Sequence, residues 1–262
     1  MTPGELDLDA FDDVPFAVAT RRELAKKGMV KARLLGRDLL ILWNGGRPRA
    51  YADACPHLCL PLSMGRHEGD RVRCAYHGWS FAAEDGQVVE QPTLRKPRPC
   101  AMKPHGALVE GGLVFAWLGD QGDEEAVRGR LPSPVLDGFS LFKVVFGCPF
   151  YMALFSSVDY AHFRYHKGYS PLYRIYGAIR GNEHEPGTSF PSKVVEEDAR
   201  RVTVRIEEAD RSIHMYASAA EMDDGGINFF QTYVTPLDAC TTLYWECYRP
   251  RSKSRLVNAA AR

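Results

Sequence analysis

Two short boxes of metal-binding side chains lie close together in this chain, Cys55–His57 (CPH) and Cys74–His77 (CAYH). Each box offers one thiolate and one imidazole. A [2Fe–2S] centre with two Cys on one iron and two His on the other needs this inventory. The alternatives are a Cys2His2 zinc site and loop residues without a metal. Zinc fingers usually pair Cys with Cys and His with His, so the alternation of Cys and His favours the iron–sulfur cluster.

A second candidate site lies on a helix that we predict from about Ala153 to His166, ended by Gly168. Asp159, His162 and His166 follow one another at spacings of three and four and share one face of this helix. Two imidazoles at positions i and i+4 can bind a single metal ion. Asp159 can accept the second N–H of a ligating His and so fix its tautomer. Taken alone, such a pair of His residues is more often incidental.

The elements that must position the first site are strands. The chain from about Gly28 to Gly119 alternates strand and turn signals, with an unbroken apolar run at Leu39–Trp43 and a hairpin signal at Gly111-Gly112. We therefore predict a small all-β domain over residues 15–120, with the Cys and His boxes on two loops that project from it. Residues 1–14 are acidic and polar and are expected to form a loosely packed N-terminal arm.

After a polar boundary at residues 119–134, a second domain is expected over residues 135–262. Its predicted elements are a strand, the helix that carries Asp159, and then an antiparallel meander. The strands are expected at Leu141–Phe146, Ser192–Glu197, Val202–Glu207, Ile213–Ser218, Ile227–Thr235 and Thr241–Tyr248. This pattern predicts an α+β fold.

Composition gives no sign of a nucleic-acid or membrane partner. The formal net charge is zero, with 33 Lys and Arg against 33 Asp and Glu. No apolar run reaches the roughly 18 residues of a membrane-spanning helix. The N-terminus does not resemble a signal peptide, and seven Cys is an odd number for a disulfide framework. These features predict a cytoplasmic protein.

The stretch from Cys55 to Phe81 resembles the cluster-binding loops of the Rieske non-haem iron oxygenases. The resemblance extends to Gly78-Trp79-Ser80-Phe81 after the second box. The respiratory type of Rieske protein has an extra Cys in each loop, and the two form a disulfide. Here Tyr76 takes the place of the second Cys, which argues against that type. One departure is Leu58-Cys59, where the oxygenases usually have Arg-Gly. We expect Cys59 to pack in the loop as a small residue and not to bind metal.

The resemblance implies a Rieske [2Fe–2S] cluster held by four ligands, which are Cys55, His57, Cys74 and His77. It further implies a helix-grip catalytic domain in which His162 and His166 bind a mononuclear Fe(II). There O2 would oxidise a small organic substrate by hydroxylation or a related mono- or dioxygenation. Electrons would come from NAD(P)H through a flavin reductase, a ferredoxin or both. In the family, electrons pass between neighbouring subunits of a ring, usually a trimer. The resemblance implies that Asp159 would carry them here.

The match is incomplete where the family has its third iron ligand, an Asp or Glu on a late helix. The sequence after Tyr248, RPRSKSRLVNAAAR, contains neither residue type, so this ligand is not identified. The catalytic domain is then expected to be short and to expose an apolar edge, in a homo- or hetero-trimer. Three explanations stay open. The iron has only two His ligands plus water or another donor, or the chain is one part of a split enzyme completed by a partner. The third, which is the alternative function, is an electron-transfer or assembly subunit of a heteromeric oxygenase with an incomplete mononuclear iron site.

Overall fold

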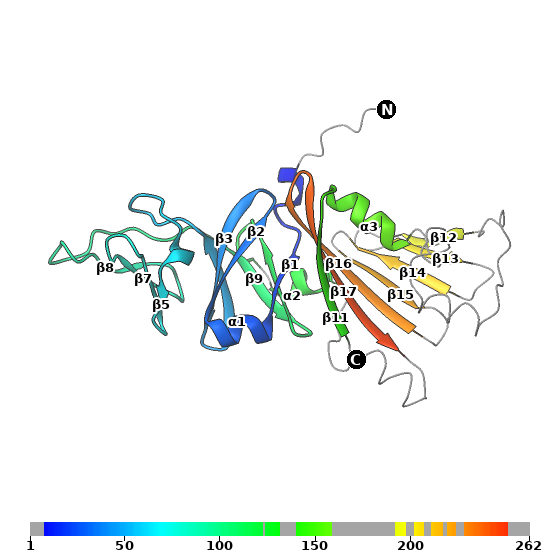
Figure 1. The fold of residues 1–262 in the computed structure, drawn as a ribbon, viewed down its shortest axis with the longest axis horizontal. Helices are drawn as coiled ribbons and strands as arrows, with labels where there is room; N and C mark the ends of the chain where they lie inside the picture. Colours follow the sequence, from blue (N-terminus) through cyan, green and yellow to red (C-terminus); the bar gives the residue numbers. More distant parts are fainter. Residues whose placement is uncertain are drawn as a thin grey trace.

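A computed structural model describes most of the chain and shows two domains joined end to end (Figure 1). The described residues are 8–122, 124–131, 140–158, 192–197, 202–206, 211–216, 219–223 and 228–250. They form sheets of six, four and seven strands. The first two sheets belong to the N-terminal domain and the third to the C-terminal domain.

The six-stranded sheet is antiparallel and has the order β1-β10-β9-β4-β3-β2. Its strands are β1 (Phe16–Thr20), β2 (Met29–Leu34), β3 (Arg37–Asn44), β4 (Arg47–Ala52), β9 (Pro104–Glu110) and β10 (Leu113–Trp117). Helix α1 (Arg21–Lys27) joins β1 to β2; the Thr20 side chain accepts from the Glu23 N–H at its start, and Gly28 ends it.

Strand β3 explains the unbroken apolar run of the sequence, because both of its faces are buried. Leu39 and Ile41 face one core, which is shared with β1 and β10. Leu40 and Leu42 face a second core, which includes the thiols Cys55 and Cys74. The strand therefore connects the main body of the domain with the region of the metal boxes.

The four-stranded sheet carries these boxes and has the order β5-β6-β7-β8. Its strands are β5 (Arg66–His67), β6 (Arg71–Arg73), β7 (Ser80–Ala82) and β8 (Val88–Glu90), preceded by a short 3-10 helix η2 (Leu62–Met64). Tyr51 of β4 attaches this sheet to the larger one, because its hydroxyl donates to the Ala83 carbonyl at 3.1 Å. Gly86 lies against the Tyr51 ring, where a Cβ atom would come within 2.8 Å of Cε1.

The C-terminal domain has an antiparallel sheet with the order β11-β17-β16-β15-β14-β13-β12. Its strands are β11 (Ser140–Phe146), β12 (Ser192–Glu197), β13 (Val202–Ile206), β14 (Arg211–Met215), β15 (Ala219–Asp223), β16 (Asn228–Asp238) and β17 (Thr241–Pro250). Helix α3 (Phe150–Val158) packs on this sheet through Phe150, Ala153 and Leu154. The described chain is thus an all-β domain followed by an α+β domain, as the sequence predicted.

The domains share a continuous apolar core at their junction. Phe115 and Trp117 of β10 belong to the same cluster as Tyr233 of β16 and Trp245 of β17. Helix α2 (Glu124–Arg128) adds Val127 to this cluster, so the polar connection between the domains is itself packed.

Hydrogen bonds cross the same junction. The Thr235 hydroxyl donates to the Ala17 carbonyl at 2.5 Å. The backbone N–H groups of Leu35 and Gly36 donate to the carbonyls of Pro236 and Leu237, each at 2.8 Å. The hairpin of β16 and β17 is therefore bonded to the N-terminal domain, and the two domains are held together by main chain as well as by apolar side chains.

The N-terminal residues 8–14 differ from the expected loose arm. Leu8 and Phe11, in a 3-10 helix η1 (Leu8–Phe11), pack against the cores of both domains. The Phe11 ring meets the Phe150 ring edge-on at 5.1 Å. Long-range packing of this kind is not visible in local sequence.

Two elements of the second domain also differ from the sequence-based expectations. Helix α3 begins at Phe150 and not at Ala153, and β15 was not predicted. Of the expected helix, the part beyond Val158 lies outside the described residues. None of the helices that the structure describes is long and apolar enough to span a membrane.

Candidate metal centre

Loop 1, residues 55–60, is a tight turn closed by two main-chain hydrogen bonds. The Cys55 N–H donates to the Leu60 carbonyl at 2.8 Å, and the Cys59 N–H donates to the Cys55 carbonyl at 2.8 Å. Cys59 has a φ of 57°, in the left-handed region that favours glycine. The turn places His57 at its tip.

Loop 2, residues 74–79, repeats this turn. The Cys74 N–H donates to the Trp79 carbonyl at 2.8 Å, and the Gly78 N–H donates to the Cys74 carbonyl at 3.2 Å. Gly78 has a φ of 71° and takes the position that Cys59 has in loop 1. The His follows its Cys by three residues here and by two in loop 1, although the backbone turn is the same.

The residues that flank each loop, here called its stem, are held by different polar groups in the two loops. In loop 1 the buried Asp53 carboxylate accepts from the Ser63 N–H at 2.7 Å and from the Ser63 hydroxyl at 2.6 Å. In loop 2 the Arg73 guanidinium donates to the Gly78 carbonyl at 3.0 Å. Each bond connects the two sides of its loop, so both loops have fixed ends.

The thiols of Cys55 and Cys74 are buried and hydrogen-bonded to each other. Burial raises the pKa of Cys55 to about 11. The backbone N–H groups of His57 and Leu58 donate to the same sulfur and partly offset this effect, because they favour the thiolate. Such a pair of buried thiols, one of them bonded by main-chain amides, is suited to a metal, since coordination deprotonates a thiol.

The imidazoles of His57 and His77 form a second pair at the surface. Their Nδ1 atoms lie 3.1 Å apart. Two ring nitrogens bound to one tetrahedral metal ion at about 2.1 Å each lie about 3.4 Å apart, so the observed separation is close to what a shared ion needs. The Trp79 ring stacks on His57 at 4.3 Å with an interplanar angle of 5° and fixes the orientation of that imidazole.

The four side chains are thus sorted by type into a buried pair of thiols and an exposed pair of imidazoles. Among the described residues, no three His, Cys, Asp or Glu side chains surround a single point. Two pairs are what a [2Fe–2S] cluster with one iron on sulfur and one on nitrogen takes. The residues therefore fit this cluster, and its imidazole side would face the exterior.

The structure places only the first predicted site. Asp159, His162 and His166 lie outside the described residues. The expectation for Cys59 was wrong in one respect, because this residue is exposed and not packed. Sequence reasoning missed Asp53, Ser63 and Arg73. Their only local signal is a charged or hydroxyl residue within a few positions of each box, which is common on protein surfaces.

Comparison with known proteins agrees with this geometry. Residues 14–108 match the family described as Rieske [2Fe-2S] domain. Over 107 residues the chain is 38% identical to the oxygenase component of chloroacetanilide N-alkylformylase from Rhizorhabdus wittichii. This match covers 40% of the present chain and 30% of that relative, so it spans less than a third of the relative's length.

Two solved structures share the fold over almost the whole chain. NdmA of Pseudomonas putida CBB5 superimposes with a TM-score of 0.72 over 97% of this chain and 78% of that one, at 18% identity. The oxygenase of carbazole 1,9a-dioxygenase, solved in complex with a ferredoxin, gives 0.70 over 95% and 74%, also at 18% identity. At such identities the likeness concerns the fold.

Proposed function

We propose that the chain is a Rieske-type oxygenase component, because residues 14–108 match the Rieske [2Fe-2S] domain family and the chain is similar in fold to the oxygenase of carbazole 1,9a-dioxygenase. Cys55, Cys74, His57 and His77 would hold the cluster. The observation that carries this proposal is the pair of Nδ1 atoms, 3.1 Å apart at the surface of loops in a chain whose fold is similar to that of an oxygenase.

When bound, the cluster would supply electrons one at a time. The protein side chains divide the remaining work. The buried thiols and the apolar core around them keep water from one side of the site, and Trp79 orients His57. The exposed imidazoles form the edge through which an electron can enter or leave.

The oxidation of substrate is assigned to the second domain. His162 and His166 would bind a mononuclear Fe(II), and Asp159 would accept the second N–H of His162. The support is the sequence motif, which in the sequence comes directly after α3, a helix that packs on the large sheet. The proposed reaction is O2-dependent hydroxylation or a related oxidation of a small organic molecule.

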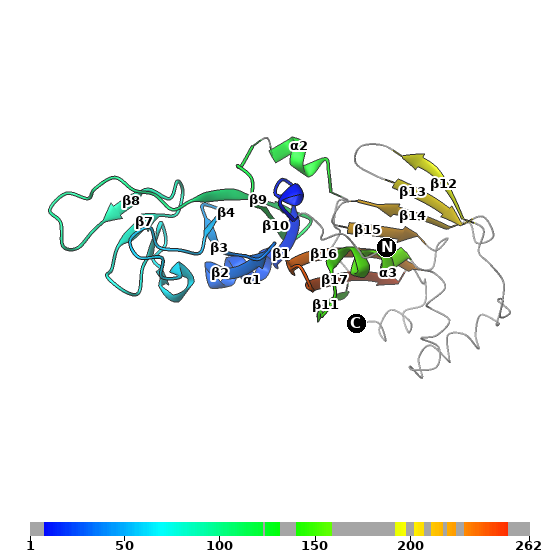
Figure 2. The same ribbon diagram turned by 90° about the horizontal axis from the view of Figure 1, so that it is seen from above.

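Electron transfer between the two sites is proposed to run between subunits. The four-stranded sheet that carries the cluster loops and the large sheet lie at opposite ends of the molecule in both views (Figures 1 and 2). A neighbouring copy in a trimer can bring its Asp159 to His77. The electron donor is proposed to be a ferredoxin, a flavin reductase that draws on NAD(P)H, or both.

The alternative is an electron-transfer or assembly subunit. It is favoured by β11, an edge strand of the large sheet on which apolar side chains are exposed. These side chains are Leu141, Phe142, Val145 and Phe146. An edge of this kind is suited to packing against another chain.

Metal analysis and O2 consumption test the proposal and separate the alternatives. An oxygenase component is expected to bind about three iron atoms per chain and a carrier about two. The oxygenase should also consume O2 when supplied with NAD(P)H, reductase and ferredoxin. Two iron atoms and no O2 consumption with a panel of aromatic and N-alkyl substrates would contradict the oxygenase proposal.

Substitution of Asp159 tests the route between subunits. Asp159→Asn should leave the iron content unchanged and lower the rate of cluster oxidation at least tenfold, because the amide cannot replace the carboxylate between two imidazoles. The matched control is Asp70→Asn, an exposed carboxylate of the cluster domain. Full activity of Asp159→Asn would contradict the proposed route.

A further inference from the structure

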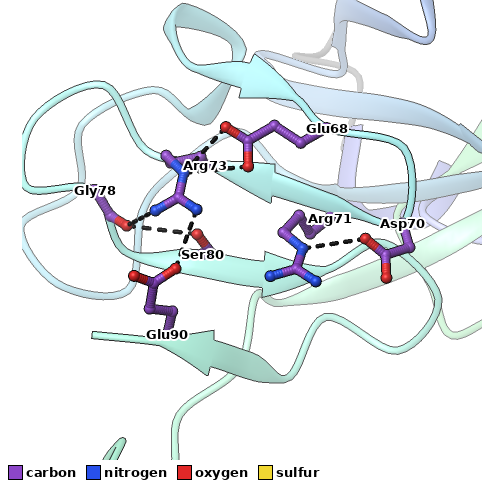
Figure 3. A network of polar contacts seen from close by, with 7 residues as sticks. All are labelled: Glu68, Asp70, Arg71, Arg73, Gly78, Ser80 and Glu90. Carbon is purple, nitrogen blue, oxygen red and sulfur yellow. Dashed lines mark hydrogen bonds and ion pairs between the residues drawn. The ribbon is translucent and has the colours of Figure 1, made fainter. Parts of the chain in front are cut away.

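Arg73 uses its whole guanidinium group in contacts within the cluster domain. It is the last residue of β6 and directly precedes Cys74. Its Nε donates to both carboxylate oxygens of Glu68 at 3.1 and 3.2 Å, its Nη2 to Glu90 at 3.0 Å, and its Nη1 to the Gly78 carbonyl at 3.0 Å (Figure 3). Every nitrogen of the guanidinium therefore has a partner.

These partners come from different parts of the four-stranded sheet. Glu68 lies between β5 and β6, and Glu90 ends β8. Since the strand order is β5-β6-β7-β8, the guanidinium connects one edge of the sheet to the other. Gly78, its third partner, directly follows His77. The network thus joins both edges of the sheet to the main chain beside a metal ligand.

These contacts contribute more to the geometry of loop 2 than to the stability of the fold. The side chains of Arg73, Glu68 and Glu90 are 30%, 37% and 45% exposed, and ion pairs at that exposure contribute little to folding. The geometric effect is larger, because a planar fork that is held at three points fixes the position of the carbonyl it binds. The Ser80 hydroxyl adds a longer bond of 3.4 Å to the same carbonyl.

We infer that Arg73 is a positioning residue for the cluster: it fixes loop 2 through the Gly78 carbonyl and thereby holds His77 at the exposed edge. Its positive charge also lies between two carboxylates next to the site and offsets them. The inference rests on the ligands proposed above and not on oxygenase chemistry. A lysine would keep the charge but could not bridge three partners.

The neighbouring residue Arg71 supplies a matched control. It lies on the same strand and carries the same charge, but its Nε donates to Asp70, an exposed carboxylate that does not belong to the cluster loops (Figure 3). Arg71→Gln therefore removes one positive charge from β6 without removing the bond to loop 2. Arg73→Gln removes both.

The test compares the full chain and its variants, each loaded with its cluster, by redox titration and by electron paramagnetic resonance of the reduced form. Arg73→Gln should shift the reduction equilibrium about tenfold toward the oxidised form, or 59 mV for one electron, and broaden the resonance because His77 is less fixed. Arg71→Gln should keep the wild-type line width. Arg73→Lys should recover most of the potential and remain broad.

The variants give outcomes that decide the inference. Equal line widths for Arg73→Gln and Arg71→Gln, or a wild-type width for Arg73→Lys, would overturn positioning and leave only a charge effect. If Arg73→Gln does not fold, the line width of Arg73→Lys carries the test alone. None of these measurements needs O2 or substrate. A wild-type protein without the resonance would instead refute the proposed ligands.

Discussion

Loop 1 and loop 2 use one backbone turn in two different settings. Both are closed by the same two main-chain hydrogen bonds, and both have a left-handed residue at the fifth position. Loop 1 is anchored by the buried carboxylate of Asp53 and loop 2 by the half-buried guanidinium of Arg73. The comparison indicates that the site requires the main-chain turn, which both loops have. The side chain that anchors each loop differs with the surroundings of that loop.

The largest expected effect is the loss of the cluster when one of its ligands is replaced. This loss should be the same for a ligand in either loop. Cys55→Ser and Cys74→Ser should each abolish cluster binding, because the buried pair cannot hold an iron through one thiolate. Bound iron and inorganic sulfide measure this loss. Cys240→Ser, an exposed thiol in the turn after β16, is the control and should retain both. A cluster that survives in either variant would contradict the shared site.

The buried anchor of loop 1, Asp53, should contribute to the free energy of unfolding. Asp53→Ala should lower the free energy of unfolding by about 2–3 kcal/mol, because it leaves the donors of Ser63 without their buried acceptor. Urea unfolding measures this change. The exposed Asp70→Ala should cost less than about 0.5 kcal/mol. A cost for Asp53→Ala no larger than that of Asp70→Ala would show that the loop 1 stem is not an anchor.

The left-handed position of loop 2 needs its glycine. Gly78→Ala should destabilise the protein by about 1–2 kcal/mol, because a Cβ atom is strained at this φ and would lie 3.3 Å from Cγ of Pro92. Gly46→Ala has the same backbone strain, and a Cβ there meets nothing within 4 Å. It should cost a similar amount in urea unfolding but leave the redox potential unchanged. Equal reduction potentials of the Gly78→Ala and Gly46→Ala variants would indicate that loop 2 tolerates the added methyl group.

At the same position in loop 1 we expect the smallest change in the free energy of unfolding, and this change should be stabilising. Cys59→Gly should stabilise the protein by about 1 kcal/mol, because glycine adopts a φ of 57° without strain. Cys59→Ser keeps the Cβ atom and should give no gain. Thermal or urea unfolding measures both. Loss of iron from Cys59→Gly would mean that Cys59 is a ligand.

The sequence predicted most of the strands and both boxes because their determinants are local. The apolar run at Leu39–Trp43 and the hairpin signal at Gly111-Gly112 each depend on neighbouring residues. The same holds for Cys55–His57, in which ligand types at short spacing are themselves the signal. Strand β15 was missed because its sequence, Ala219–Asp223 (AAEMD), has no β-branched or aromatic residue.

What the sequence did not predict depends on contacts between distant residues. Phe11 packs on Phe150, and Thr235 bonds to Ala17, across more than a hundred residues in each case. The left-handed conformation of Cys59 was hidden because no glycine marks it. It becomes visible from the backbone φ of 57° in the structure. Tertiary structure, not local propensity, fixes these features.

Pulsed electron paramagnetic resonance of the reduced protein would show directly whether the two loops together hold one [2Fe–2S] cluster through two thiolates and two imidazoles. We expect couplings from two imidazole nitrogens on one iron, and the loss of one of them in His57→Ala or His77→Ala if the cluster survives there. A protein purified with zinc and without inorganic sulfide, or a cluster whose spectrum lacks nitrogen couplings, would contradict this expectation.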